Sequence, residues 1–169
     1  MPAYVVGNYF DIRVANRMAH ALSPGLTPGH NILRRLFLDP ADHEFYVDWD
    51  RVTAEVVGGL RSKTAADPGD PRLAELVGEL SIGSDRFRSL WARADVGRGR
   101  NGVTHVHHPQ VGELRLLHGK LDLGGAGGLQ LVVHHAEPGT DAVQALALLG
   151  TLTATLVREE SPTGEHAPS

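Results

Sequence analysis

The sequence predicts an α+β fold in which helices pack on one face of an antiparallel β-sheet. Strand-like stretches stand near both ends of the chain, and helix-like stretches fill the middle. Blocks of strands and helices that are separated in this way are typical of α+β domains, whereas regular alternation predicts a parallel sheet. The length of 169 residues fits one domain with a single sizeable core.

The stretch from Tyr4 to Ala15 predicts two short strands. Apolar and charged residues alternate in its second half, which is the period of a half-buried strand, and Gly7-Asn8 turns the chain between the strands. The alternating apolar residues are Phe10, Ile12 and Val14. Asn16 then predicts the N-cap of a short helix over residues 17–22.

The middle of the chain, from about Pro40 to Ala94, predicts a helical block. Helix starts are indicated by Asp39-Pro40, Asp70-Pro71 and Ser84. After each start, apolar residues recur every three or four positions, as on one face of a helix. These stripes are Phe45, Trp49, Val52, Val56 and Leu60, then Leu73, Leu76, Val77 and Leu80, then Phe87, Leu90, Trp91 and Ala94.

Three further strands are predicted after Gly102. They cover residues 103–107, 112–121 and 129–136, and a glycine-rich hairpin joins the last two before a closing helix that starts at Asp141. A five-stranded antiparallel sheet with a helical block between strands two and three is the PAS-like arrangement, which has a cavity between sheet and helices. We expect the domain to span residues 3–150, and residues 151–169 to form a partly disordered C-terminal tail.

Composition and charge exclude several classes of function. The net charge is -4, which is a poor match to a phosphate backbone, so direct binding of nucleic acid is not expected. The chain has no cysteine, which excludes disulfides and thiolate metal sites. No apolar run is long enough to span a bilayer, and no secretory signal stands at the start. We therefore expect a cytoplasmic protein with no membrane partner.

The residues give no positive case for an enzyme or a cofactor. Ser81 and Ser84 lack the Gly-x-Ser-x-Gly setting of a hydrolase nucleophile, and the glycine run at 124–128 lacks the lysine of a phosphate-binding loop. The strand histidines leave a metal-dependent enzyme open as a less favoured alternative. These are His105, His107, His134 and His135, with Glu113 or Glu137 as a nearby carboxylate.

A series of short motifs resembles the ligand-binding domain of MmyB-like transcription regulators. In chain order the matching stretches are Asn31-Ile32-Leu33-Arg34, Leu36-Phe37-Leu38-Asp39-Pro40, Asp48-Trp49, Gly59-Leu60-Arg61, Asp70-Pro71-Arg72-Leu73, Leu76-Val77-Gly78-Glu79-Leu80-Ser81, Ser84-Asp85-Arg86-Phe87, Leu90-Trp91, His108-Pro109, Val111-Gly112-Glu113-Leu114 and Glu137-Pro138-Gly139. The resemblance extends over roughly residues 3–150. Each motif is weak alone, but their order and spacing together are specific.

The resemblance implies a PAS-like sensor that binds an apolar small molecule, with fatty acids as the known ligand type. It also implies control of a helix-turn-helix DNA-binding domain, which normally precedes the sensor and is absent from this chain. DNA contact is therefore expected only through that missing N-terminal domain. Where many relatives carry a tyrosine this chain has His118, so a contact made by the tyrosine hydroxyl is not carried over.

We expect the ligand cavity to have apolar walls from both layers and a donor for a carboxylate, since a buried unpaired charge is costly. The expected helical wall consists of Trp49, Leu60, Phe87 and Trp91, and the expected sheet wall of Phe10, Ile12, Leu114, Leu116, Leu131 and Val133. The expected head-group donors are Arg61, Arg88 and His108.

A structural interpretation of these residues stays open beside the ligand-binding one. Aromatic residues at helical spacing are often simply core, and arginines on amphipathic helices usually face water or pair with an acid. His108-Pro109 also marks a bend at a strand end.

The main alternative function is a ligand-free dimerisation module. In that case an apolar sheet face or the last helix would pair with a second copy of the chain. A small molecule carried by the purified protein would favour the sensor instead.

Overall fold

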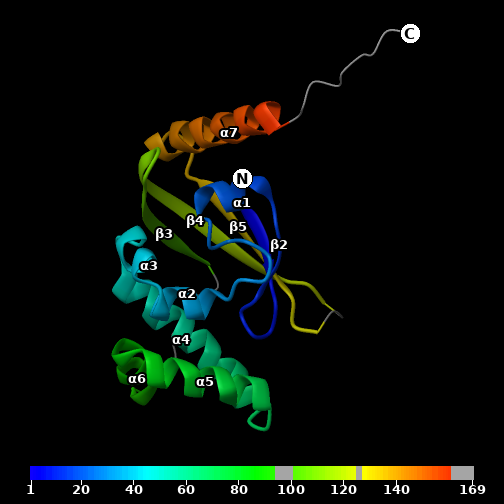
Figure 1. The fold of residues 1–169 in the computed structure, drawn as a ribbon, viewed down its shortest axis with the longest axis vertical. Helices are drawn as coiled ribbons and strands as arrows, with labels where there is room; N and C mark the ends of the chain where they lie inside the picture. Colours follow the sequence, from blue (N-terminus) through cyan, green and yellow to red (C-terminus); the bar gives the residue numbers. More distant parts are fainter. Residues whose placement is uncertain (94–100, 125–126, 161–169) are drawn as a thin grey trace, which may run out of the picture.

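The computed structural model describes residues 1–93, 101–124 and 127–160 as a sheet with helices on one side (Figure 1). The strands are β1 (Ala3–Val6), β2 (Ile12–Ala15), β3 (Asn101–His108), β4 (Gly112–Asp122) and β5 (Gln130–Ala136). The helices are α1 (Arg17–Leu22), α2 (Ile32–Leu38), α3 (Pro40–Phe45), α4 (Trp49–Ala66), α5 (Pro71–Gly83), α6 (Asp85–Ala92) and α7 (Asp141–Glu160).

The five strands form one antiparallel sheet in the order β2-β1-β5-β4-β3. The first strand therefore pairs with the last, and the helices from α1 to α6 connect the edge strand β2 to the opposite edge strand β3. This is the predicted PAS-like α+β fold with a helical block between strands two and three, and the prediction is confirmed.

The predicted helix starts are also confirmed by their capping bonds. The side chains of Asn16, Asp39, Asp70 and Ser84 each accept a hydrogen bond from a backbone N–H two or three residues later. These bonds satisfy N–H groups that have no partner within the helix. Local sequence alone thus sets where α1, α3, α5 and α6 begin.

Two predictions about the helices are corrected by the structure: α2 was not predicted, and α3 and α4 were predicted as one helix. Helix α2 begins after Asn31, whose side chain accepts from two backbone N–H groups, but the preceding loop residues Pro28 and Gly29 masked this signal. The predicted single stripe from Phe45 to Leu60 is wrong, because an extended segment separates α3 from α4. There Tyr46 bridges to Val106 of β3, and the neighbouring backbone N–H donates to His105.

The second strand does not keep one side-chain alternation. Phe10 lies before β2 in the left-handed region, with a φ of 65°, and the pairing of β1 with β2 shifts register between Val5 and Val6. This irregularity, a bulge, turns Val14 outward to 62% exposure while Ile12 is buried at 1%. Phe10, Ile12 and Val14 therefore do not share one face as predicted.

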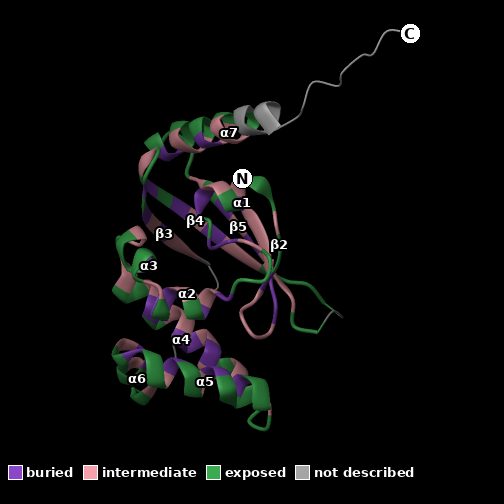
Figure 2. Cartoon of the chain, viewed as in Figure 1, coloured by how far each residue is buried: buried purple, intermediate pink, exposed green. Residues whose placement is uncertain are grey.

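The molecule has a second helical layer that the sequence did not predict. Helices α2 and α4 lie between the sheet and the pair α5–α6, which is furthest from the sheet (Figure 1). Figure 2 shows the buried residues concentrated where these layers meet. One core joins α2, α4, α5 and α6, and another joins the sheet to α1 and α7.

Helix α7 crosses the expected domain boundary. It runs from Asp141 to Glu160, past residue 150, and packs against α1 and β4. Of the expected disordered tail, residues 161–169 lie outside the described residues. Within the part of the chain that the structure describes, no helix is long and apolar enough to cross a membrane.

Candidate ligand-binding cavity

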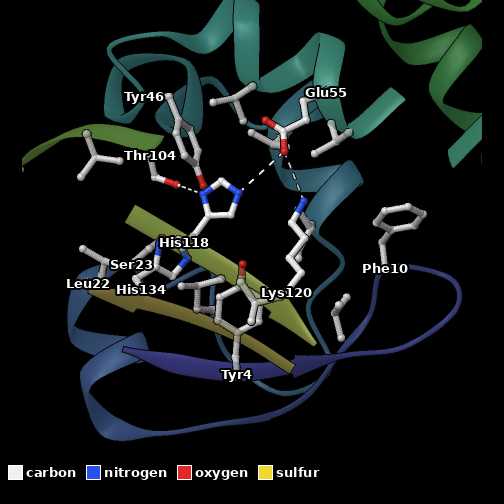
Figure 3. Close-up of a pocket in the computed structure, with 18 of the residues that line it drawn as sticks. Tyr4, Phe10, Leu22, Ser23, Tyr46, Glu55, Thr104, His118, Lys120 and His134 are labelled. Carbon is white, nitrogen blue, oxygen red and sulfur yellow. Dashed lines mark hydrogen bonds and ion pairs between the residues drawn. The ribbon is translucent and has the colours of Figure 1, made fainter. Parts of the chain in front are cut away.

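A partly open cavity of about 110 Å³ lies between the sheet and the helices that cover it (Figure 3). The sheet side comes from β1, β3, β4 and β5, and the helical side from α1 to α4 and their connections. The lining residues are Tyr4, Val6, Phe10, Leu22, Ser23, Leu26, Ile32, Leu36, Phe45, Tyr46, Val52, Glu55, Val56, Val103, Thr104, Val106, His118, Lys120, Gln130, Val132 and His134.

Strand and helix periodicities aim these residues at the cavity. Along β5 the residues Gln130, Val132 and His134 line it in alternation, as side chains on one face of a strand must. Along α4 the residues Val52 and Val56 line it, one helical turn apart. Most of the lining residues are apolar. The polar ones lie at positions that the same strand and helix periodicities turn towards the cavity.

Polar side chains gather on the β4 side of the cavity. The Nδ1 atom of His118 lies 2.9 Å from the hydroxyl of Thr104, and its Nε2 atom lies 3.7 Å from Glu55. The ammonium group of Lys120 donates to the same Glu55 oxygen at 3.3 Å. The other Glu55 oxygen faces Arg51 at 3.5 Å. A mainly apolar cavity thus contains a carboxylate with three basic neighbours.

These neighbours keep Glu55 ionised. The His118 imidazole and then the Lys120 ammonium lower the pKa of this carboxyl to about 2, against its burial, which raises the pKa. The 3.7 Å separation from His118 is too long for a strong hydrogen bond, so the 3.3 Å ion pair with Lys120 is the stronger contact. The lysine charge is therefore already balanced inside the protein.

The neighbouring strand β5 carries His134, which is paired with His118 and is held in its uncharged form. Burial, together with the positive charge of its neighbours, lowers the pKa of His134 to about 3, so its ring is neutral at pH 7. It packs beside Tyr4 at 5.9 Å and His118 at 5.6 Å between ring centroids. Burial also raises the pKa of Tyr4 and Tyr46, so both hydroxyls stay protonated.

The comparison with protein families decides what kind of domain this is. The family model of the MmyB-like transcription regulator ligand binding domain matches residues 1–149. The chain belongs to this family. A comparison with curated proteins finds no match.

In this MmyB-like domain the expected helical wall lies away from the cavity. Leu60 and Phe87 are fully buried in the core between α4, α5 and α6, and Trp49 and Trp91 pack against that core. The physical reason is that Trp49 and Leu60 of α4 pack towards α2, α5 and α6, and that Phe87 and Trp91 belong to α6, which lies on the far side of α4 from the sheet (Figure 1). Ligand binding by them stays a prediction that the position of this cavity does not support.

The two expected arginine anchors have partners within the protein. Arg61 donates to the backbone carbonyls of Leu90, Trp91 and Arg93, and so holds the C-terminal end of α6. Arg88 pairs with Asp85 and donates to the Ser81 carbonyl. Neither lines the cavity, so a role in holding a carboxylate also stays a prediction.

The expected sheet residues divide between two faces. Leu114 and Leu116 share a face with His118 but are buried under α1 and α7. Leu131 lies between Gln130 and Val132, which both line the cavity, so strand alternation turns it to the other face. The same alternation places Val133 on that other face.

His108 has two partners within the protein. Its Nδ1 accepts from the backbone of Gln110, and its Nε2 lies 2.9 Å from the carbonyl of Ala21 at the end of α1. Of the thirteen residues expected to surround the ligand, Phe10 lines the cavity and the other twelve do not.

Sequence reasoning did not select the polar residues of the cavity. These are Tyr4, Ser23, Tyr46, Glu55, Thr104, His118, Lys120, Gln130 and His134. Continuing the alternation of Leu114 and Leu116 to positions 118 and 120 was the available signal. For the metal alternative, the described residues contain no group of three or more side chains suited to hold a metal ion.

Proposed function

We propose that this domain is the sensor of a bacterial transcription regulator. It binds an apolar, fatty-acid-like small molecule in the cavity, and occupancy controls a helix-turn-helix DNA-binding domain in the cytoplasm. The observation that carries the proposal is the largely apolar cavity between the sheet and α4, in a domain of a ligand-binding family. An apolar pocket with a few converging polar groups is the usual form of a small-molecule site.

The cavity volume sets the size of the ligand. A water needs about 10–15 Å³ of such space, so 110 Å³ holds roughly seven to eleven water-sized groups. An alkyl chain of about eight carbons therefore fits, and a longer chain requires the walls to move or a tail to protrude. Burial of about eight methylenes contributes about 6 kcal/mol before the entropic cost of association.

Helix α4 offers a route for the signal. Val52 and Val56 line the cavity and also pack against the core that Val57 and Leu60 form with α5 and α6. A ligand that moves α4 therefore changes the packing of the outer helices. Such a ligand shifts the population between two arrangements only by its difference in affinity for them.

Extraction and mass spectrometry of the purified protein test the proposal first, and a co-purified alkyl compound is the expected result. Calorimetry then compares the parent with Val56→Trp, which fills the cavity, and with Val14→Trp, which changes an exposed site outside the lining. We expect Val56→Trp to lose binding of 1-decanol and decanoic acid and Val14→Trp to keep it. A parent protein that binds neither compound would contradict the proposal.

A homodimer is the second candidate, and one surface row favours it. Val14 pairs with Val5, Val5 with Leu131, and Leu131 with Leu121, so four apolar residues run across the face of the sheet opposite the cavity. Val14 is 62% and Leu121 56% exposed. Light scattering of the parent and of Leu121→Glu tests it, with a dimer expected for the parent alone. A monomeric parent would exclude this candidate.

A further inference from the structure

The cavity contains two tyrosine hydroxyls without a hydrogen-bond partner in the part of the chain that the structure describes. Figure 3 shows Tyr46 entering from the helical side and Tyr4 from β1, with both hydroxyls directed into the cavity. Neither hydroxyl oxygen is among the fully buried atoms without a partner in the described residues, so both are accessible from the cavity and free to bond to a ligand there. Two free hydroxyls in one cavity therefore indicate a polar group of the occupant.

A third unpartnered group lies beside them. The Nδ1 atom of His134 is buried and has no hydrogen-bond partner among the described residues, and the ring packs beside Tyr4. Since the low pKa of His134 keeps this imidazole neutral, it offers one donor and one acceptor. Apart from the Nε2 atom of His118, which faces Glu55 at 3.7 Å, the available groups are thus uncharged.

The charged groups, in contrast, are already paired. Lys120 is the single lysine or arginine among the described lining residues, and it donates to Glu55. A ligand carboxylate at Lys120 would stand next to the Glu55 carboxylate and compete with it for the same ammonium group. Two carboxylates at one site repel each other strongly in a low-dielectric cavity.

We propose that the polar end of the ligand is an uncharged oxygen group, a hydroxyl or carbonyl on an alkyl chain, and that Tyr4, Tyr46 and His134 bind it. This inference rests on the proposed function, because it assumes that the cavity holds an alkyl ligand. It departs from a free fatty acid, whose carboxylate is ionised at neutral pH. The hydroxyls donate to the ligand oxygen, and His134 donates to it or accepts from it.

Three probes of equal chain length test the proposal: 1-decanol, decanoic acid and decane. Each is delivered from methyl-β-cyclodextrin at pH 7.5 and titrated calorimetrically into the full chain. We expect 1-decanol to bind about tenfold tighter than decanoic acid. Tyr4→Phe and Tyr46→Phe should each weaken the binding of 1-decanol about three- to tenfold, because each removes one hydrogen bond. Both variants should leave the affinity for decane unchanged.

Tyr9→Phe is the matched control. Its hydroxyl bonds to Asp70 outside the cavity, so 1-decanol binding stays at the parent value. If decanoic acid binds as tightly as 1-decanol, and if Lys120→Met weakens the binding of decanoic acid, the inference is overturned in favour of a carboxylate ligand. Decane binding as tightly as 1-decanol would overturn it while leaving the proposed function intact. If no probe binds, the proposed function fails and the inference fails with it.

Discussion

Glu55 and His134 line the same cavity, where the folded protein favours the charged form of Glu55 and the uncharged form of His134. The pKa of Glu55 is lowered because the folded protein stabilises its charge, and the pKa of His134 is lowered because burial destabilises its charge. Both shifts make the folded state lose stability as the pH falls, but over different pH ranges. Measurements of stability against pH can therefore distinguish the contribution of Glu55 from that of His134.

Glu55→Gln is expected to destabilise the domain at pH 7. Folding lowers the pKa of this carboxyl from its ordinary value of 4.5 to about 2, so the ionised carboxylate contributes up to about 3 kcal/mol of stability above pH 4.5. This contribution is lost as the pH falls through the folded-state pKa. Urea unfolding at pH 7, 4 and 3 should show the parent approaching the variant. The exposed Glu44→Gln serves as control, and a constant difference from pH 7 to 3 would contradict the assignment.

His134→Phe is expected to flatten the pH dependence of stability between pH 6.5 and 4. In the unfolded chain the imidazole gains a proton below pH 6.5, whereas the folded state resists it to about pH 3. One such group costs about 2 kcal/mol of stability at pH 5. Urea unfolding at pH 7.5 and 5 measures it, with the exposed His30→Asn as control. A slope in His134→Phe equal to that of the parent would show that other groups cause it.

At the scale of elements, α4 is the part that joins the cavity to the outer helices. Its 18 residues present Val52, Glu55 and Val56 to the sheet and Val57 and Leu60 to α5 and α6. The predicted stripe is present in α4 as Trp49, Val52, Val56 and Leu60, but its first residue, Phe45, belongs to the separate helix α3. Arg61 of the same helix donates hydrogen bonds to backbone carbonyls at the end of α6.

Arg61→Ala is expected to destabilise the domain by about 2 kcal/mol, because the end of α6 loses a charged donor to three backbone carbonyls. Arg88→Ala is the matched control, since its half-exposed side chain makes a surface ion pair worth little. Chemical unfolding measures both, and 1-decanol affinity should stay unchanged in both. A loss of affinity in folded Arg61→Ala would restore this arginine as a ligand anchor.

At the scale of the whole molecule, the net charge of -4 opposes contact with DNA. The proposed regulation therefore needs the separate DNA-binding domain, and the sensor contributes through its conformation. The layered arrangement, with the cavity on one side of α4 and the outer helices on the other, suits such a role.

The isolated chain is expected not to bind duplex DNA specifically. Its acidic charge gives no counterion release on a phosphate backbone, so affinity at physiological salt should stay in the weak non-specific range. Fluorescence anisotropy with labelled duplexes, at low and physiological salt, measures it. Nanomolar, sequence-selective binding would contradict this expectation.

The sequence by itself determined the fold class, the order of elements and most helix starts. These depend on local signals, such as the side chains of Asn16 and Asp70, which cap their helices from two or three residues away. Strand periodicity likewise placed β4 and β5 almost correctly. The family motifs, which are read in order along the chain, identified the ligand-binding domain.

Only the tertiary structure decided which faces meet. The bulge between Ile12 and Val14, the link at Tyr46 and the second helical layer all depend on contacts between residues far apart in the chain. As a result, Leu60 and Trp91 pack in or against the helical core, whereas Tyr4, Glu55 and His134 line one cavity. Periodicity gives the direction of a side chain on its own element, but the packing partner of that face is set by the fold as a whole.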